Sequence, residues 1–405
     1  MKRLFLFTTL FIISFSIISN AQTATKWRGP HQNGNYDETG LLDKWPESGP
    51  EMLWHFDNLG EGYSAPAFAN QKVFVSGMEG TTGYIYALTD EGKLIWKESY
   101  GSEFTNSYPG SRATPVVVGD YVYILSGMGD LTCMSSISGK IHWKKDINKE
   151  FGGRIIEWGY NETVNILGDM LILTPGGREH NMIAVNLLDG KLIWSSKGLG
   201  EKSAYCTPLL IKTGSRDLLV THTEDHIIGI DASDGALLWQ HKHPNRYSVH
   251  PNTPIYYDNQ LFCFSGYGQG GVNLQLSSDG SSVTKKWFSE TLDSRIGGAV
   301  VVDGKLYGSG DTNREWQCID WNTGKTLYSS KDIGNGVVIT AEGLLYLYSQ
   351  KGELALVKPE NNGFNILSET KISTGSGQHW AHPVINKGRL FIRHGNTLIA
   401  YNIQK

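Results

Sequence analysis

A short phrase that ends in tryptophan recurs along the chain. A glycine, a lysine or alanine and two further, mostly apolar residues lead each time into a tryptophan, at Trp96, Trp143, Trp194 and Trp239. Self-similarity at roughly 40 to 50 residues is typical of propellers and repeat arrays, in which one unit cannot bury its apolar face without a neighbour. The repeat therefore restricts the fold before any site is considered.

Weaker copies of the phrase continue toward the C-terminus and lead to Trp287, Tyr328 and Leu367. Trp54 lies in a similar apolar run but has no unit of its own, and the chain ends with three expected strands, within residues 380–403, that lack a tryptophan strand. The two fragments complement each other. We therefore predict an all-β, eight-bladed β-propeller closed by an N-terminal strand at residues 51–56, because this pairing leaves no open seam.

Each unit is expected to hold four strands. In residues 205–239, an inner strand follows Pro208, the second and third span 217–222 and 226–231, and the fourth carries Trp239. The runs are rich in β-branched and aromatic residues and are bounded by Gly, Asp and Asn, and no long run has a helical period. The repeated tryptophans most simply form a belt between adjacent blades, where loss of one side chain would destabilise the fold by about 3 to 5 kcal/mol.

The N-terminus has the features of an export signal. Lys2 and Arg3 precede an apolar run over residues 4–18, and small residues at 19–21 predict cleavage after Ala21. We expect a signal peptide at 1–21, an N-terminal arm at 22–50 and one propeller domain at 51–405. A membrane anchor is the alternative, although the run is short for a spanning helix. With no cysteine near the cleavage point, we expect a periplasmic or secreted monomer without a transmembrane segment.

Charge and cysteine content exclude some functions. The formal charge is −4, and cleavage of the signal peptide would remove two basic residues and give −6. Without a basic run, the chain offers no footprint for nucleic acid. Four cysteines, in expected strands of four different blades, are interpreted as buried free thiols rather than a disulfide framework: Cys133, Cys206, Cys263 and Cys318.

The repeat resembles that of the pyrroloquinoline quinone (PQQ) family of propellers, and the resemblance covers residues 54–405. That family contains quinoprotein alcohol dehydrogenases and, without cofactor, the BamB subunit of the outer-membrane β-barrel assembly machinery. The short blades favour the second group. The opening Trp27-Arg28-Gly29-Pro30 also resembles the start of exported PQQ-like propellers of unassigned role. The resemblance predicts the fold strongly and a cofactor weakly, since the tryptophans serve packing whether or not a quinone is bound.

The dehydrogenases of this family imply a vicinal disulfide beneath PQQ, a Ca²⁺ held by carboxylate and amide oxygens, and an Asp base. No two cysteines are adjacent in this chain, and no Cys-x-x-Cys-His stretch for a haem is present. No metal ligand or catalytic residue of the family can be carried over. We therefore expect no cofactor and no catalytic or metal site, with PQQ and Ca²⁺ as the alternative.

An axial funnel is expected where the inner strands begin. The relevant residues lie three positions before each inner strand, or next to that position. Together they supply aromatic faces, two arginines, a carboxylate and histidines. Such a lining suits a planar or anionic small molecule or an extended peptide. The alternative is a plug of mutually satisfied side chains. The predicted lining is Tyr63, Arg112, Glu157, Trp158, Tyr205, His250, Arg295, His379, Trp380 and His382.

Two smaller groups of residues are interpreted as turns rather than as metal or phosphate sites. His222, Glu224 and His226 flank a hairpin turn that we expect to be solvated, and three ligands alone are weak support for a metal. The glycines at 268, 270 and 271 precede no helix that could receive a phosphate.

Three functions remain open. The chain is expected to be an exported, non-enzymatic propeller of the BamB type that binds a protein or peptide of the cell envelope or a small molecule in its funnel. The alternatives are a PQQ-dependent oxidoreductase acting on alcohols or sugars, and a protein that binds carbohydrate or another small molecule through exposed aromatic rings.

Overall fold

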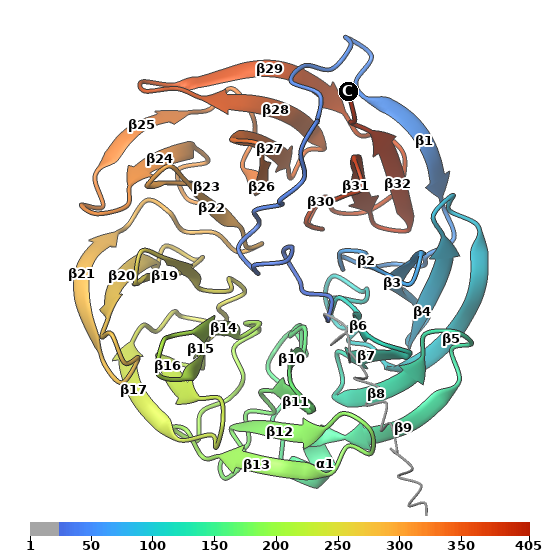
Figure 1. Cartoon of the computed structure of the whole chain (residues 1–405), viewed down its shortest axis with the longest axis vertical. Coiled ribbons are helices and arrows are strands. Elements are labelled where there is room, and N and C mark those ends of the chain that lie inside the picture. Colours follow the sequence, from blue (N-terminus) through green and yellow to red (C-terminus); the bar gives the residue numbers. More distant parts are fainter. Residues whose placement is uncertain (1–23) are drawn as a thin grey trace, which may run out of the picture.

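A computed structural model describes residues 24–405 and contains eight four-stranded antiparallel sheets arranged around one axis (Figure 1). The first strand of each unit lies nearest the axis and the last lies at the perimeter. The predicted eight-bladed propeller is confirmed. The predicted signal peptide at residues 1–21 lies outside the described residues.

Seven blades each consist of four consecutive strands, and we number them in chain order. Blades 1 to 4 contain β2 (Ala67–Ala69), β3 (Lys72–Glu79), β4 (Thr82–Thr89) and β5 (Leu94–Ser102); β6 (Val116–Val118), β7 (Tyr121–Leu125), β8 (Asp130–Ser135) and β9 (Ile141–Asp146); β10 (Asn165–Leu167), β11 (Met170–Leu173), β12 (Met182–Asn186) and β13 (Leu192–Ser196); and β14 (Leu209–Lys212), β15 (Asp217–His222), β16 (His226–Asp231) and β17 (Leu237–Lys242). Blades 5 to 7 contain β18 (Ile255–Tyr257), β19 (Gln260–Ser265), β20 (Gly270–Leu276) and β21 (Val283–Ser289); β22 (Ala299–Val302), β23 (Lys305–Ser309), β24 (Trp316–Asp320) and β25 (Thr326–Ser330); and β26 (Gly336–Ala341), β27 (Leu344–Ser349), β28 (Glu353–Pro359) and β29 (Phe364–Lys371).

The eighth blade joins the two ends of the propeller domain. It contains β30 (Val384–Asn386), β31 (Arg389–His394), β32 (Thr397–Asn402) and, at the perimeter, β1 (Glu51–Phe56). In the antiparallel pair of β1 and β32, Met52 lies opposite Tyr401 and Trp54 opposite Ala400. The predicted closure by an N-terminal strand is confirmed, and it covers the edge that β32 would otherwise expose.

The repeated tryptophans lie between neighbouring blades, as predicted. The indole N–H of Trp143 donates to the carbonyl of Leu187 in the next blade at 2.9 Å, and that of Trp194 donates to Ala232 at 3.2 Å. The ring of Trp194 also lies against Gly235, where an added Cβ would be 2.6 Å from a ring carbon. The glycine and the tryptophan of the repeated phrase are thus two halves of one contact between successive blades.

The structure has one short helix among residues 24–405, α1 (Ile147–Phe151), between blades 2 and 3. The carboxylate of Asp146 caps it by accepting bonds from the backbone N–H groups of Asn148 and Lys149. Within the same residues, no helix is long and apolar enough to cross a membrane.

The cysteines are buried free thiols, as predicted. Three lie in strands, but Cys206 lies in the loop before β14, so its placement in a strand was wrong. His222 also differs from expectation, because it is buried rather than solvated and stacks on His250, while His226 bonds to Glu201. His222 and His226 therefore face different partners and do not converge.

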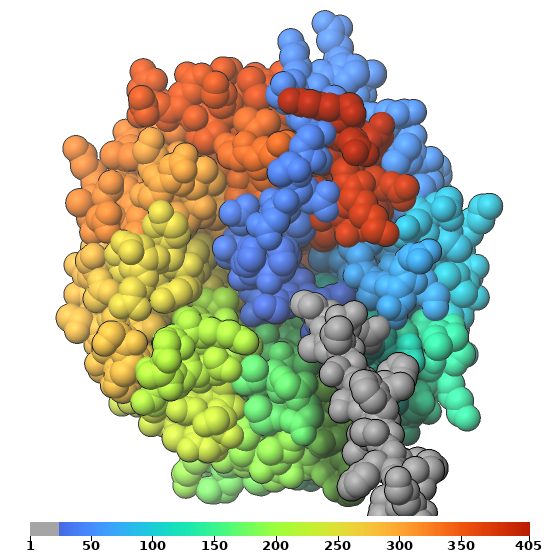
Figure 2. All heavy atoms as spheres, viewed as in Figure 1, coloured from blue at the N-terminus to red at the C-terminus, as the bar shows by residue number. Residues whose placement is uncertain are grey.

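The N-terminal arm, residues 24–50, crosses the axis and closes one end of the central channel (Figures 1 and 2). Its backbone bonds to several blades: the amide of Thr25 donates to Val117, that of Tyr36 to Thr340 and that of Leu42 to Ile403. Arg28, a residue of the arm, is buried and donates to the carbonyl of Ala299 at 2.6 Å. The arm therefore acts as a plug that links blades distant in sequence.

Candidate functional site

A cavity of about 630 Å³ lies on the axis above the arm. All its lining residues belong to loops or to the arm, and none lies in a strand. The loops before the inner strands converge on the axis because each blade directs its inner strand there. The lining comprises Trp27, Tyr63, Tyr108, Arg112, Glu157, Trp158, Asn161, Thr163, Tyr205, Thr207, Tyr247, Val249, Pro251, Tyr267, Arg295, Ile296, Gln350, Gln378, Trp380 and His382.

The cavity brings together eight of the ten residues predicted for the funnel. They are Tyr63, Arg112, Glu157, Trp158, Tyr205, Arg295, Trp380 and His382. The structure places His250 and His379 behind the lining: His250 stacks on His222, and His379 stacks on His394 with ring centroids 3.7 Å apart. Their chain neighbours face the cavity instead, as expected where successive side chains of an extended segment point in opposite directions. A role of these residues in ligand binding remains a prediction.

Aromatic side chains form two walls. One wall is the cluster of Tyr63, Tyr108 and Trp380, in which the tryptophan ring lies 5.2 Å and 4.8 Å from the two tyrosine rings. The other is the cluster of Trp158, Tyr247 and Tyr267, with ring centroids 5.6 Å and 4.6 Å apart. The walls come from loops far apart in sequence, so the fold alone brings them to one cavity.

Three of the tyrosines have strained backbones. Tyr108, Tyr205 and Tyr267 have φ of 46°, 76° and 65°, in the left-handed region that bulky residues rarely adopt. Strain of this kind costs about 1 to 3 kcal/mol per residue and concentrates at functional sites. The other residues with positive φ, glycines aside, are polar or charged, so aromatic residues in this conformation occur, within residues 24–405, only at the cavity.

The charged groups of the cavity largely balance. The guanidinium of Arg112 donates to the backbone carbonyls of Ser107, Tyr108 and Gly110 and thus holds the loop that carries Tyr108. Arg295 pairs with Asp311 at 2.9 Å. Burial raises the pKa of Asp311, and the neighbouring guanidinium opposes that shift. Glu157 adds an exposed carboxylate, so the lining carries little net charge.

Trp27 and His382 form the floor. Their rings meet edge to face at 5.0 Å, so the arm contributes directly to the cavity. Burial, helped by the charge of Arg28, lowers the pKa of His382 to about 3, and the ring is therefore neutral. Its Nε2 bonds to the carbonyl of Ile296 at 3.2 Å, which can only accept, so Nδ1 is an acceptor. Neither Nδ1 of His382 nor Nε1 of Trp380 has a hydrogen-bond partner among residues 24–405.

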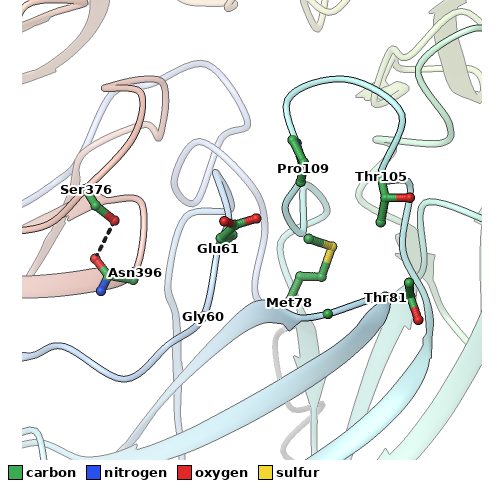
Figure 3. Close-up of a pocket in the computed structure, with 9 residues that line it drawn as sticks. Gly60, Glu61, Met78, Thr81, Thr105, Pro109, Ser376 and Asn396 are labelled. Atoms are coloured by element: carbon green, nitrogen blue, oxygen red, sulfur yellow. Dashed lines mark hydrogen bonds between the residues drawn. The ribbon is translucent and has the colours of Figure 1, made fainter.

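A shallower groove of about 670 Å³ adjoins the cavity (Figure 3). Glu61 projects between its two sides, and the Ser376 hydroxyl bonds to the Asn396 side chain at 2.9 Å on one of them. The hydroxyl of Tyr63, a cavity residue, donates to the carbonyl of Pro109, a groove residue. The Tyr63–Pro109 contact is thus the shared wall of the two hollows.

The lining does not fit a quinone with a bound calcium ion. Ca²⁺ takes about six to eight oxygen ligands, whereas Glu157 is the single carboxylate among the lining residues. Across residues 24–405 no group of three His, Cys, Asp or Glu side chains is arranged to hold a metal ion. The balanced charges also give a tricarboxylate no strong electrostatic attraction.

Several lining residues were not predicted, above all Trp27, Tyr108, Tyr247 and Tyr267. The three tyrosines lie in loops whose lengths differ between blades, so a fixed offset from the inner strand misses them. Trp27 lies in the arm, which has no counterpart in the repeat. Dense aromatic residues in non-repeating loops were the one available signal.

Known proteins match the chain in sequence and in structure. The profile of the family described as "Outer membrane protein assembly factor BamB" matches residues 81–330. BamB of Salmonella typhimurium is 26% identical over 185 residues, which cover 45% of this chain and 42% of that protein. BamB of Shewanella oneidensis is 25% identical over 284 residues, covering 68% and 66%. The matched region thus spans less than half the length of the Salmonella relative.

Solved structures share the fold at low sequence identity. BamB from Moraxella catarrhalis has a TM-score of 0.63 and 14% identity and covers 87% of this chain and 97% of that chain. Quinohemoprotein alcohol dehydrogenase from Comamonas testosteroni has a TM-score of 0.65 and 10% identity, with 92% and 79% covered. At these identities the two structures support the fold and leave the choice between binding and catalysis to the residues of the site.

Proposed function

The chain belongs to the BamB-like family of PQQ-like β-propellers, and we propose that it acts in the cell envelope as a non-enzymatic binding or scaffold protein. The axial cavity is its ligand site, and the occupant is a protein segment, a peptide or a small molecule. The expected signal peptide at residues 1–21 and the kinship with BamB support a periplasmic or secreted location.

One observation carries the proposal: the cavity is lined by eight aromatic side chains, three of them on strained tyrosines. A plug needs no aromatic residue in the left-handed region: in the arm, which closes the other end of the channel, the non-glycine residues with positive φ are Arg28 and Gln32. Backbone strain is retained where it places a side chain that function requires. The volume also falls within the range of about 300 to 1,000 Å³ that is common for ligand sites.

A ligand screen tests this proposal. The mature protein is titrated with three sets of probes: unfolded outer-membrane protein peptides, neutral oligosaccharides and planar aromatic acids, with tryptophan fluorescence and melting temperature as readouts. We expect at least one set to bind, with binding lost in Trp158→Ala and retained in Phe288→Ala, an aromatic change on the outer strand β21. Binding that survives Trp158→Ala, or no binding by any set, would contradict the cavity as the working site.

A turnover assay tests the oxidoreductase alternative. Because the lining lacks a calcium donor set, we expect no dye reduction with primary alcohols, aldoses or polyols in the presence of PQQ and Ca²⁺. Steady reduction that disappears on chelation and returns with Ca²⁺ would overturn the non-enzymatic assignment.

A further inference from the structure

We propose that the axial cavity binds a neutral carbohydrate, with a sugar ring held between the two aromatic walls; this inference rests on the cavity being the ligand site. The walls are the Tyr63–Tyr108–Trp380 cluster and the Trp158–Tyr247–Tyr267 cluster. Tryptophan and tyrosine offer a large apolar face together with a polar edge, and this combination matches the C–H faces and hydroxyl rim of a sugar ring.

The polar side chains of the lining suit a hydroxyl-bearing ligand. The amides of Asn161, Gln350 and Gln378 can both donate and accept, as can the hydroxyls of Thr163 and Thr207. A sugar hydroxyl can likewise do both, whereas a carboxylate can only accept.

The charge of the lining favours a neutral ligand over an anion. Arg112 uses three of its five N–H donors on backbone carbonyls, and Asp311 neutralises Arg295. An anion would also face the exposed carboxylate of Glu157. The amides of Asn161, Gln350 and Gln378 and the hydroxyls of Thr163 and Thr207 complete a polar, uncharged set of lining groups.

The backbone of the cavity disfavours an extended peptide. One common way for an extended peptide to bind is to add a strand to an exposed sheet edge, where main-chain hydrogen bonds provide affinity. Every lining residue of this cavity lies outside the strands, so no such edge faces the ligand. Side-chain stacking and hydrogen bonds must provide the affinity, as they do for sugars.

The groove of Figure 3 extends the site. Thr81, Thr105, Ser376 and Asn396 present hydroxyl and amide groups on the far side of the Tyr63–Pro109 contact. A sugar chain that leaves the cavity over this contact meets polar partners along its path. We therefore expect a hexaose to bind more tightly than the disaccharide of the same glycan. For a β-1,4-glucan, cellohexaose should bind more tightly than cellobiose.

The experiment uses isothermal titration calorimetry of the mature protein with hexaoses of glucose (β-1,4 and α-1,4), xylose and mannose. Hexagalacturonate serves as the anionic comparison, and an unfolded outer-membrane protein peptide as the protein comparison. We expect a neutral hexaose to bind and Trp380→Ala to weaken it about tenfold, a factor that corresponds to about 1.4 kcal/mol. Trp380→Phe, which keeps the ring but removes the N–H donor, should lose less, and Phe288→Ala should lose nothing.

Other outcomes separate this inference from the proposed function. Binding of the peptide or of hexagalacturonate alone, lost in Trp380→Ala, would overturn the neutral carbohydrate and leave the cavity as a ligand site. No binding by any probe, with cavity variants indistinguishable from the parent protein, would overturn both. Equal affinity for the hexaose and its disaccharide would remove the groove from the site.

Discussion

The contact between Gly235 and Trp194 gives a sharp test of how the blades are held together. Gly235 has φ of 80°, and an added Cβ would lie 2.6 Å from a ring carbon of Trp194 in the preceding blade. Gly304 is a matched control, because its φ of 70° is similar and an added Cβ would have nothing within 4 Å. Alanine at either position meets the same backbone strain, but only Gly235→Ala displaces the tryptophan.

The magnitudes can be separated. Left-handed strain should destabilise both variants by about 1 to 2 kcal/mol. Overpacking against Trp194 should add about 1 to 3 kcal/mol to Gly235→Ala alone. Trp194→Ala should itself lose about 3 to 5 kcal/mol, because the side chain is 8% exposed and its N–H bonds to Ala232.

A double-mutant cycle measures this coupling. Unfolding in urea, followed by fluorescence and circular dichroism, gives the free energy of unfolding for the two glycine variants in the parent and Trp194→Ala backgrounds. Once the ring is absent, Gly235→Ala should cost no more than Gly304→Ala. A penalty that persists without the tryptophan, or equal penalties in the parent protein, would refute the interlocking of the two halves of the repeat.

Three further predictions follow from other parts of the molecule. A protein that begins at Gly60 lacks β1 and the arm and should melt well below one that begins at Ala24, because β32 becomes an exposed edge; similar melting temperatures would contradict the closure. Burial raises the pKa of Glu162 to about 8, so the folded state keeps a proton that the unfolded chain releases above about pH 4.3. The free energy of unfolding should therefore decrease from about pH 4.3 to 8, and Glu162→Gln should flatten that decrease by up to about 1.4 kcal/mol per pH unit; equal slopes at pH 5.5 to 8 would refute it. Tyr108→Gly should relieve left-handed strain at a side chain that is 53% exposed, and its free energy of unfolding should exceed that of Tyr108→Ala by about 1 kcal/mol. Both variants should weaken ligand binding. A lower melting temperature for Tyr108→Gly than for Tyr108→Ala would contradict the role of strain.

The sequence predicted the fold because packing in a propeller is periodic. The same contact between a tryptophan and a glycine of the next blade occurs for Trp54, Trp96, Trp143, Trp194 and Trp287, so it leaves a repeated pattern in the sequence. Even the closing strand could be predicted. The strand that carries Trp54 belongs to no repeat unit, and the final unit lacks a tryptophan strand, so the one completes the other. An arm at 22–50 was expected, but its course across the axis was not, because its backbone bonds to Val117, Thr340 and Ile403 follow no repeat.

The lining of the cavity was predicted in part, for a geometric reason. A fixed offset from the inner strand locates residues such as Tyr63 and Arg112, because every blade begins its inner strand at the axis. The offset does not say which of two adjacent side chains faces inward, and His250 and His379 therefore lie behind Pro251 and Trp380. It also says nothing about Tyr267, which reaches the cavity from the loop between β19 and β20.

The tryptophans are of two kinds: some pack between neighbouring blades, and others line the axial cavity. Trp143, Trp194 and Trp239 each donate their N–H to a carbonyl of the next blade, so their hydrogen-bonding capacity is used within the fold. Trp380 packs on two tyrosines, yet its N–H has no partner among residues 24–405. Trp96 also belongs to the repeat, and its N–H likewise has no partner among residues 24–405, so an unused donor does not separate the two kinds. Their positions do: the ring of a repeated tryptophan such as Trp194 lies against a glycine of the next blade, whereas Trp380 interrupts the repeat and lines the cavity, where its ring can stack on a ligand.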